Sequence, residues 1–254
     1  MVDMHTHILP RLDDGAKDSS TSMAMLRLSK AQGVDTVVLT PHFYGKRHNP
    51  AEFLLRRNAS YQRLLARMQE TQTQINVRLG AEVHFTGINL PDFDDLCSLA
   101  IEGTKYILFE LPFTTKWAGT IEEKLQEFIN ETEYTPIIAH VERYAEIRKN
   151  PSIVARLIHM GCLIQVNAQA FVNRKDKGFA FALLKKNSVH CIGSDAHDET
   201  GRAPNLLEAK NAIEKAGFLE KWKDVQDVMK NVLQDEKVQT QSVVPVKKLF
   251  GFYR

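Results

Sequence analysis

The amino-terminal segment carries two histidines in alternation. His5 and His7 close a short apolar run that begins at Val2. Residues i and i+2 of a β-strand point to the same face, so both imidazoles are expected to point the same way. Imidazole nitrogens are common ligands of divalent metal ions. An isolated His-x-His pattern is weak evidence, and its value depends on whether other ligands follow later strands.

Other ligand-type side chains do follow the later strand-like runs, and six of the seven runs have histidine, aspartate or glutamate at or next to their carboxyl end. These nitrogen and oxygen donors suit Mn, Fe or Zn better than a site that prefers thiolates. Nine ligands are too many for one ion, so a cluster of two or three ions is predicted. Beyond the first pair, the candidates are Asp14, His42, Glu82, Glu110, His140, Asp195 and His197.

Each candidate also has a structural interpretation. Glu82 or Glu110 alone could form a salt bridge, and His140 could be a core histidine. Asp195 could cap a helix. Burying so many ionisable groups at one end of the strands without metal would be costly, which favours ligation. The other histidines lack this pattern, and we expect structural roles for His48, His84, His159 and His190.

Strand-like and helix-like segments alternate along the chain, as in parallel βαβ units. Seven strands without a polar edge strand favour a closed, distorted (β/α)7 TIM-like barrel in the α/β class. The expected strands are Val2–His5, Thr36–Thr40, Val77–Val83, Tyr106–Leu111, Pro136–His140, Leu163–Asn167 and Val189–Gly193. The expected helices are Ser20–Gln32, Ala51–Thr73, Asp92–Ile101, Ile121–Glu131, Ser152–Met160, Phe179–Lys186, Asn205–Ala216 and Lys221–Gln234.

Length and composition fit one soluble domain. The 254 residues show no repeat or break in composition, so we expect a barrel with C-terminal helices over 1–234 and a basic, apolar tail over 235–254. A net charge of +2 gives nucleic-acid binding no support. We expect neither a signal peptide nor a membrane insertion. Three scattered cysteines suit reduced thiols in the cytoplasm.

Two loops fall at the end of the strands where barrel enzymes build their active sites, Phe43–Pro50 and Pro112–Thr120. Their polar and aromatic residues fit substrate contacts and ordinary solvated loops equally well. These residues are Tyr44, Lys46, Arg47, His48, Lys116 and Trp117.

The ordered set of motifs resembles the polymerase-and-histidinol-phosphatase (PHP) superfamily over nearly the whole chain. The motifs are His5-x-His7, Asp14-Gly15, Pro41-His42, Gly80-Ala81-Glu82, Glu110, Ala139-His140-x-Glu142-Arg143 and Ser194-Asp195-x-His197. More narrowly, the stretch from His5 to Gly15 is similar to the bacterial metal-dependent protein-tyrosine phosphatases of capsule and exopolysaccharide gene clusters.

The resemblance implies a PHP-type barrel with three divalent metal ions, Mn being favoured over Fe or Zn. By position, His5, His7, Glu82 and Asp195 would hold one ion. A second ion would be bridged by Glu82 and bound by Glu110 and His140. The third would be bound by Asp14, His42 and His197.

The resemblance also implies phosphate-binding roles for Arg143 and Arg202. The rigid guanidinium fork independently suits two phosphate oxygens. We hypothesise that a hydroxide bridging two ions attacks phosphorus in line. His42 or His197 could donate a proton to the leaving group, and the sequence leaves this role open.

A thiol-based phosphatase is excluded by spacing. Such enzymes need an arginine six positions after the nucleophilic cysteine. Here Cys97, Cys162 and Cys191 are followed at that distance by glycine, alanine and histidine. The sequence therefore predicts sensitivity to metal chelation and little response to thiol alkylation.

Three other functions compete with phosphotyrosine hydrolysis. A PHP phosphoesterase for a small monoester such as histidinol phosphate would share the metal site, but usually has longer insertions. An amidohydrolase usually has a lysine where Glu110 stands. A regulatory module without activity would have lost ligands. The resemblance implies the phosphotyrosine-containing tail of a bacterial tyrosine kinase as the partner, and the oligomeric state is not predicted.

Overall fold

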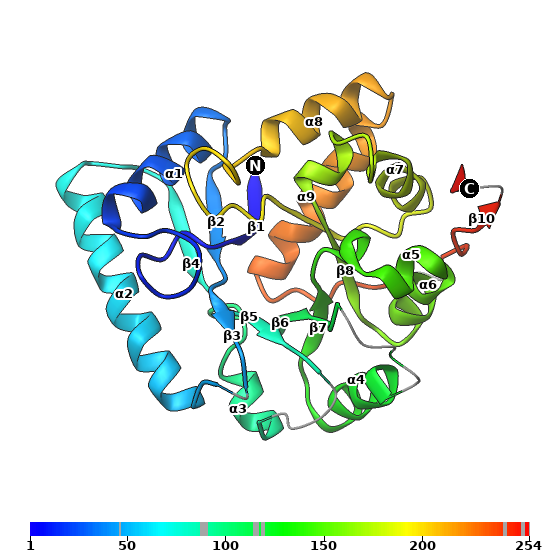
Figure 1. Cartoon of the computed structure of the whole chain (residues 1–254), viewed down its shortest axis with the longest axis horizontal. Coiled ribbons are helices and arrows are strands. Elements are labelled where there is room, and N and C mark those ends of the chain that lie inside the picture. The colour runs from blue at the N-terminus through cyan, green and yellow to red at the C-terminus, as the bar shows by residue number, and fades with distance from the viewer. Residues whose placement is uncertain are drawn as a thin grey trace.

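Parallel strands form the centre of the protein, and helices pack around them (Figure 1). The computed structural model describes residues 1–45, 47–86, 91–113, 117, 120–240, 243–249 and 252–253. Lys46 and Lys116, two of the predicted loop contacts, lie outside this part. No helix in the described part is long and apolar enough to cross a membrane.

The central strands belong to two parallel groups, ordered β1-β2-β4 and β3-β5-β6-β7-β8-β9. A parallel bridge between Thr6 and Ala196 joins the end of β1 to the chain after β9. The sheet is therefore curled. The strands are β1 (Val2–Thr6), β2 (Thr36–Leu39), β3 (His42–Phe43), β4 (Asn76–Leu79), β5 (Glu82–His84), β6 (Tyr106–Glu110), β7 (Thr135–Ile138), β8 (Leu163–Asn167) and β9 (Cys191–Gly193).

The second and third expected strands differ from the structure. The run Thr36–Thr40 ends early as β2, and the chain resumes at His42 as β3. Pro41, which has no N–H to donate to a ladder, lies in this break. The run Val77–Val83 divides likewise into β4 and β5, and β3 pairs with β5 as β2 pairs with β4. His42 and Glu82 thereby become register partners.

The helices cover the outside of the sheet and begin where the sequence supplies caps. The Asp18 carboxylate accepts the Thr21 N–H at the start of α1, and Asn49 caps α2 ahead of Pro50. The helices are α1 (Ser19–Ala31), α2 (Pro50–Glu70), α3 (Phe93–Cys97), α4 (Thr120–Glu131), α5 (Ala145–Lys149), α6 (Ser152–His159), α7 (Lys177–Lys185), α8 (Leu206–Lys215) and α9 (Leu219–Leu233), with short 3-10 turns η1 (Val141–Arg143) and η2 (Ala168–Phe171).

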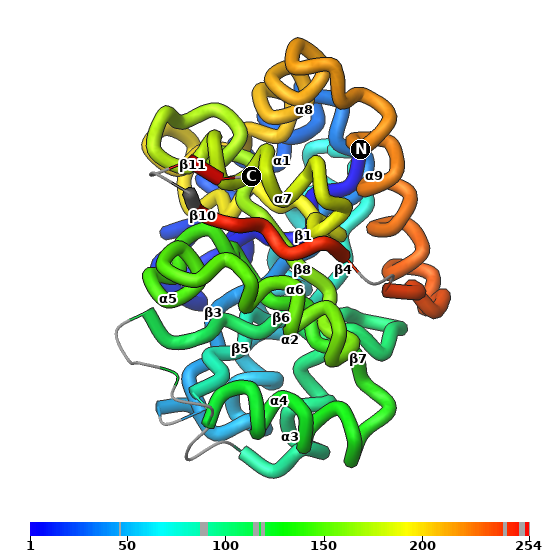
Figure 2. Tube along the Cα trace, turned by 90° about the vertical axis from the view of Figure 1, so that its right-hand side faces the viewer, coloured from blue at the N-terminus to red at the C-terminus, as the bar shows by residue number. Residues whose placement is uncertain are grey.

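Helix α3 is shorter than the expected Asp92–Ile101 helix, and α5 was not expected. After α9, the chain runs back across the side that carries α6 and α7 (Figure 2). It ends in an antiparallel pair, β10 (Lys248–Leu249) and β11 (Phe252–Tyr253). The Tyr253 ring lies 4.7 Å from the Phe179 ring of α7.

Candidate metal centre

The predicted ligands meet at the carboxyl ends of the strands. Two glycines let the backbone approach the first histidine pair closely. A Cβ on Gly15 would lie 2.1 Å from the His7 carbonyl oxygen, and one on Gly193 would lie 2.5 Å from the His5 Cβ. The Asp14-Gly15 and Gly193-Ser194 segments thus pack directly against the His-x-His strand.

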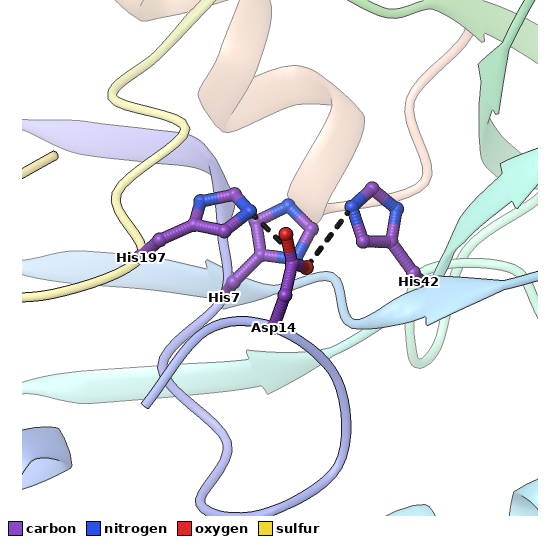
Figure 3. A group of neighbouring side chains, drawn as sticks. All are labelled: His7, Asp14, His42 and His197. Carbon is purple, nitrogen blue, oxygen red and sulfur yellow. Dashed lines mark ion pairs between the residues drawn. The ribbon is translucent and has the colours of Figure 1, made fainter. Parts of the chain in front are cut away.

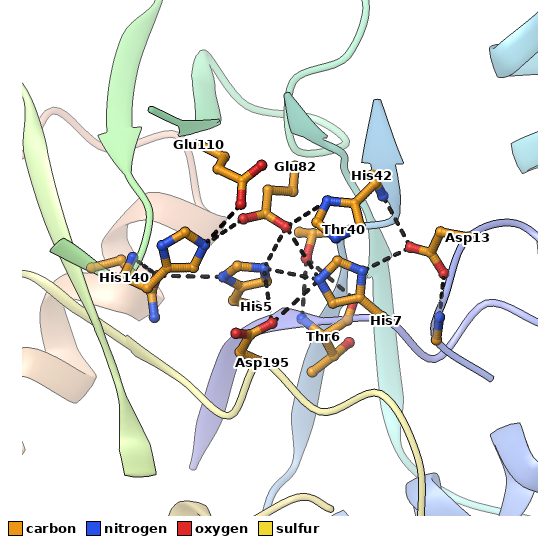
Figure 4. Close-up of polar contacts among 12 residues, drawn as sticks. His5, Thr6, His7, Asp13, Thr40, His42, Glu82, Glu110, His140 and Asp195 are labelled. Atoms are coloured by element: carbon orange, nitrogen blue, oxygen red, sulfur yellow. Dashed lines mark hydrogen bonds and ion pairs between the residues drawn. The ribbon is translucent and has the colours of Figure 1, made fainter. Parts of the chain in front are cut away.

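The two first histidines turn one nitrogen of each ring to the same point (Figure 4). His5 Nδ1 lies 3.3 Å from the Gln165 side-chain oxygen, and His7 Nδ1 lies 2.7 Å from Asp13 Oδ2. With the protons on those Nδ1 atoms, both Nε2 atoms carry lone pairs. They face each other at 3.1 Å, an arrangement that a cation between them would stabilise.

Glu82 is the carboxylate at the middle of the cluster. Its Oε2 lies 3.1 Å from His5 Nε2, 3.2 Å from His7 Nε2 and 3.0 Å from His42 Nδ1. Its Oε1 lies 2.7 Å from His140 Nε2. One carboxylate with both oxygens among four imidazoles has the arrangement of a bridging ligand.

A second group lies at the outer rim (Figure 3). Asp14 Oδ1 is 3.5 Å from His42 Nε2 and 3.5 Å from His197 Nε2. The His7 and His197 ring centroids lie 3.9 Å apart, with the ring planes tilted by 33°. Asp14 is 66% exposed, so this group opens to solvent, whereas His5, His7 and Glu82 are buried.

The inner end of the cluster contains His140 and Glu110. His140 Nε2 lies 3.6 Å from Glu110 Oε1. His140 follows β7 rather than ending it, and its backbone has φ of 32°. Asp195 also has positive φ, at 54°. Left-handed backbone is unfavourable for non-glycine residues and often marks functional positions.

Every predicted ligand belongs to at least one group whose donor atoms lie within 4.8 Å of one another. Several of these buried donors, His42 Nδ1, Glu82 Oε2 and His197 Nε2, have no hydrogen-bond partner among the described residues. The donor set therefore fits divalent ions. The groups are His7–Asp14–His42–His197, His5–Glu82–His140, His5–His7–Asp195 and His42–Glu82–Glu110.

The protonation of the cluster without metal shows how much negative charge it contains. Burial lowers the pKa of His5, but the charges of Glu82 and Asp195 outweigh burial, and the pKa is raised. Burial likewise opposes protonation of His7, yet Asp13 raises its pKa well above the usual value. The carboxylates thus favour positive charge at the point where the two Nε2 atoms meet.

Arg143 and Arg202 converge on Asp195 beside the cluster. Arg143 Nη1 and Arg202 Nη2 lie 3.1 Å and 2.9 Å from Asp195 Oδ2. Their side chains are 42% and 45% exposed. Both border a cavity of about 630 Å³ that is otherwise lined largely by polar residues, including Asn167 and Asn205. The two guanidinium groups are therefore placed to meet an anion at the mouth of the site.

Of the predicted loop contacts, those near Tyr44 lie beside the cluster and Trp117 does not. The Tyr44 ring lies 5.2 Å from His42, and Arg47 lies over Tyr44. His48 Nδ1 accepts the Tyr44 N–H. Trp117 is instead buried, and its Nε1 donates to the Pro112 carbonyl, so it packs within its loop.

The four histidines expected to be structural lie outside the groups of candidate ligands. His84 nevertheless lies close to the centre, with Nδ1 3.1 Å from Glu110 Oε2. His190 is buried, and its Nδ1 accepts the Ile164 N–H.

Asp13 and Phe113 lie beside the site and were not predicted. Asp13 accepts hydrogen bonds from the His42 N–H at 3.0 Å and the Gly15 N–H at 3.0 Å, besides contacting His7. The paired Asp13-Asp14 sequence signalled a carboxylate here, but not which of the two supports a ligand. Phe113 was also missed; its ring stacks against His140 and lies 4.9 Å from the Arg143 guanidinium.

Comparisons with known proteins agree with this geometry. The family described as "Capsular polysaccharide synthesis, CpsB/CapC" matches residues 1–233. Tyrosine-protein phosphatase YwqE of Bacillus subtilis (strain 168) is 33% identical, with 100% of both chains covered. Tyrosine-protein phosphatase CpsB of Streptococcus pneumoniae is 30% identical, with 89% of this chain and 94% of CpsB covered.

Solved structures give the same result. A match described as crystal structures of YwqE from Bacillus subtilis and CpsB from Streptococcus pneumoniae, "unique metal-dependent tyrosine phosphatases", has a TM-score of 0.83 and 30% identity. It covers 97% of this chain and 100% of the other.

Proposed function

The chain belongs to the CpsB/CapC family of capsular polysaccharide synthesis, and we propose that it is a metal-dependent protein-tyrosine phosphatase. One observation carries the metal dependence: His5 Nε2, His7 Nε2 and Glu82 Oε2 lie within 3.2 Å of one another with their lone pairs turned inward. The homologues named tyrosine-protein phosphatases support the substrate class.

The nine candidate ligands would hold divalent ions, and we propose three, with Mn favoured over Fe or Zn. When bound, such ions lower the pKa of a coordinated water to about 7 and place positive charge near phosphoryl oxygens. The chain's own contribution is to fix the ligands. Asp13 holds the His7 ring through Nδ1, which leaves Nε2 free to ligate.

Arg143 and Arg202 are proposed to bind the phosphate of the substrate. In the structure they share Asp195 Oδ2, and a phosphate at the mouth would offer them oxygens with more charge. Their guanidinium groups would then neutralise charge that develops on the phosphoryl group.

Either His42 or His197 could donate the proton to the leaving phenolate. His197 Nδ1 lies 2.9 Å from the Asp195 backbone carbonyl, so Nδ1 donates and Nε2 keeps its lone pair. That arrangement, with a pKa lowered to about 4 by burial and by the charge of His7, suits ligation better than proton donation. We propose His42 as the donor, through Nε2 at the rim beside Asp14, with Nδ1 beside Glu82 as its ligating nitrogen. A phenol, with a pKa of about 10, needs less protonation than an alcohol.

A cysteine nucleophile is not part of the proposal. The thiols of Cys97, Cys162 and Cys191 are free, and burial raises the pKa of Cys97 to about 11 and that of Cys162 to about 12. Such thiols are almost fully protonated at neutral pH.

Several finer statements are also proposals. We propose a seven-stranded PHP-type barrel over 1–234, supported by the Thr6–Ala196 bridge, and a separate tail over 235–254. The proposed substrate is the phosphotyrosine-containing tail of a bacterial tyrosine kinase, supported by the family's association with capsule synthesis. The free cysteines support a cytoplasmic location.

The test compares a phosphotyrosine peptide with histidinol phosphate as substrates of the Mn-loaded protein. We expect clear preference for the peptide, loss of activity with a chelator, and recovery on returning Mn. The variant His5→Ala should lose both bound metal and activity. Preference for histidinol phosphate would overturn the substrate assignment, and full activity in chelator would overturn the metal mechanism.

A further inference from the structure

Strand β8 contains none of the candidate ligands, yet it lies between β7 and β9, after which His140 and Asp195 follow. Two of its side chains are buried amides. Gln165 is fully buried and Asn167 is 8% exposed. Buried amides are retained only where their donors and acceptors are paired, so their partners indicate their function.

The hydrogen bonds of these amides have only one consistent direction. The His140 backbone N–H can only donate, so the Gln165 atom at 2.6 Å from it must be the oxygen. Gln165 Nε2 then donates to Asn167 Oδ1 at 2.9 Å. Asn167 Nδ2 in turn donates to Asp195 Oδ2 at 2.9 Å, and an ionised carboxylate can only accept. The His140 N–H at one end of this series of hydrogen bonds and the Asp195 carboxylate at the other therefore fix the orientation of both amides.

At the Gln165 end, the orientation of the amide fixes the tautomer of the His5 ring. The same Gln165 oxygen lies 3.3 Å from His5 Nδ1, so that nitrogen must carry the proton to form the bond. His5 Nε2 then presents its lone pair to Glu82 and His7. One oxygen thus sets the tautomer of His5 and holds the backbone of His140.

At the Asn167 end of these hydrogen bonds, the two oxygens of Asp195 have different partners. Oδ1 faces the cluster, 3.7 Å from His5 Nε2 and 3.5 Å from His7 Nε2. Oδ2 accepts hydrogen bonds from Asn167 and Arg143 and forms an ion pair with Arg202. The arginines are exposed enough to turn to a phosphate, whereas the buried Asn167 stays and keeps Oδ1 aimed at the cluster.

We propose that Gln165 and Asn167 are positioning residues of the metal centre. Gln165 selects the ligating tautomer of His5, and Asn167 keeps Asp195 oriented when substrate draws the arginines away. The inference rests on the proposed function only in requiring that the centre binds a divalent ion. Partners of this kind typically contribute about 10- to 100-fold to metal affinity.

The test measures the dissociation constant for Mn²⁺ by competition with a chelator, together with metal content. In Gln165→Met the volume is nearly kept and both polar atoms are lost, and we expect affinity to fall about 10- to 100-fold. In Gln165→Glu an acceptor for His5 and His140 remains but the donor to Asn167 is lost, so we expect a smaller loss of affinity than in Gln165→Met. This isosteric variant separates loss of the acceptor from a change in packing.

The chain offers a matched control in Gln226→Met. Gln226 is also a buried glutamine whose oxygen accepts a backbone N–H, that of Val2 at 2.8 Å, but it lies at the opposite end of β1 from the cluster. We expect this variant to lose stability without losing metal affinity.

Unchanged Mn²⁺ affinity in Gln165→Met would overturn the proposal, as would equal losses in Gln165→Met and Gln226→Met or in Gln165→Glu. If Gln165→Met does not fold, Asn167→Ala replaces it, with reduced affinity expected and unchanged affinity overturning the role. A protein that binds Mn²⁺ as described but does not hydrolyse phosphotyrosine would refute the proposed function alone.

Discussion

Replacing Asp13 by asparagine should weaken metal binding without altering any proposed ligand. Asp13 accepts from His7 Nδ1 at 2.7 Å, and from the backbone N–H groups of Gly15 and His42 at 3.0 Å. Burial opposes ionisation of Asp13, but the charge of His7 and these donors outweigh burial and hold its pKa below the usual value.

The magnitude follows from the change in acceptors. Asparagine has one oxygen. In the place of Oδ2 it accepts from His7 and His42 as a neutral group, and the Gly15 N–H is left without an acceptor. In the place of Oδ1 it leaves both His7 Nδ1 and the His42 N–H without an acceptor. Losing a hydrogen bond to a charged group costs about 1.5–3 kcal/mol. At 1.4 kcal/mol for each factor of ten, metal affinity should fall by about 10- to 100-fold, which agrees with typical effects of such partners.

The assay is a chelator-competition titration with Mn²⁺, with Asp198→Asn as the control. Asp198 also accepts backbone N–H groups, from Thr200, Gly201 and Arg202, but no described imidazole contacts it. We expect Asp198→Asn to alter KM through the Arg202 loop and to leave metal affinity unchanged. Affinity in Asp13→Asn equal to that of the unaltered protein would refute the reasoning.

Four further outcomes are expected. Removing metal with a chelator should lower Tm by about 5–10 °C, since ligand at 100 times Kd contributes about 2.7 kcal/mol, and scanning calorimetry measures the shift. Arg202→Ala should lower kcat/KM for a phosphotyrosine peptide by about 100-fold in steady-state assays, because a donor to the phosphoryl group is lost. Phe113→Ala should lower kcat/KM for aryl phosphates about 3- to 10-fold and leave alkyl phosphates unchanged, since Phe113 is 36% exposed beside Arg143 and can stack on the substrate ring. Burial lowers the pKa of His190 to about 4 from 6.5, so between these pH values only the unfolded chain is protonated. The free energy of unfolding should therefore fall by about 3 kcal/mol as the pH is lowered through this window, as measured by denaturant titration. The variant His190→Asn should not show this loss.

Much of the fold can be predicted from the sequence because local patterns mark where most helices begin. The helix beginning after Asp18 has a capping carboxylate, and the one beginning at Pro50 has both a cap and a favourable first residue. Local patterns do not show where a strand breaks within an apolar run. The division of β2 from β3 at Pro41 depends on pairing with the equally divided β4 and β5, which is a property of the whole sheet.

The metal ligands can also be predicted from the sequence, because histidines and carboxylates at strand ends are unusual unless they have a function. Supporting residues are not, because Gln165 and Asn167 do not differ in type from ordinary buried amides. Only their partners reveal the role: the His140 N–H at one end and the Asp195 carboxylate at the other. The choice between Asp13 and Asp14 is likewise made by the fold of their loop, in which Gly15 packs against His7.

The supporting contacts also explain how two ligands keep an unfavourable backbone. His140 and Asp195 have φ of 32° and 54°, and a left-handed residue that is not glycine costs about 1–2 kcal/mol. Each is held by a hydrogen bond from its own N–H, His140 to the Gln165 oxygen at 2.6 Å and Asp195 to the His5 carbonyl at 2.9 Å. Both bonds lead to His5, since the Gln165 oxygen also contacts its ring. The strain is therefore balanced by contacts that simultaneously place three ligands, which makes the preorganisation of the centre a cooperative property of β1 and β8 together.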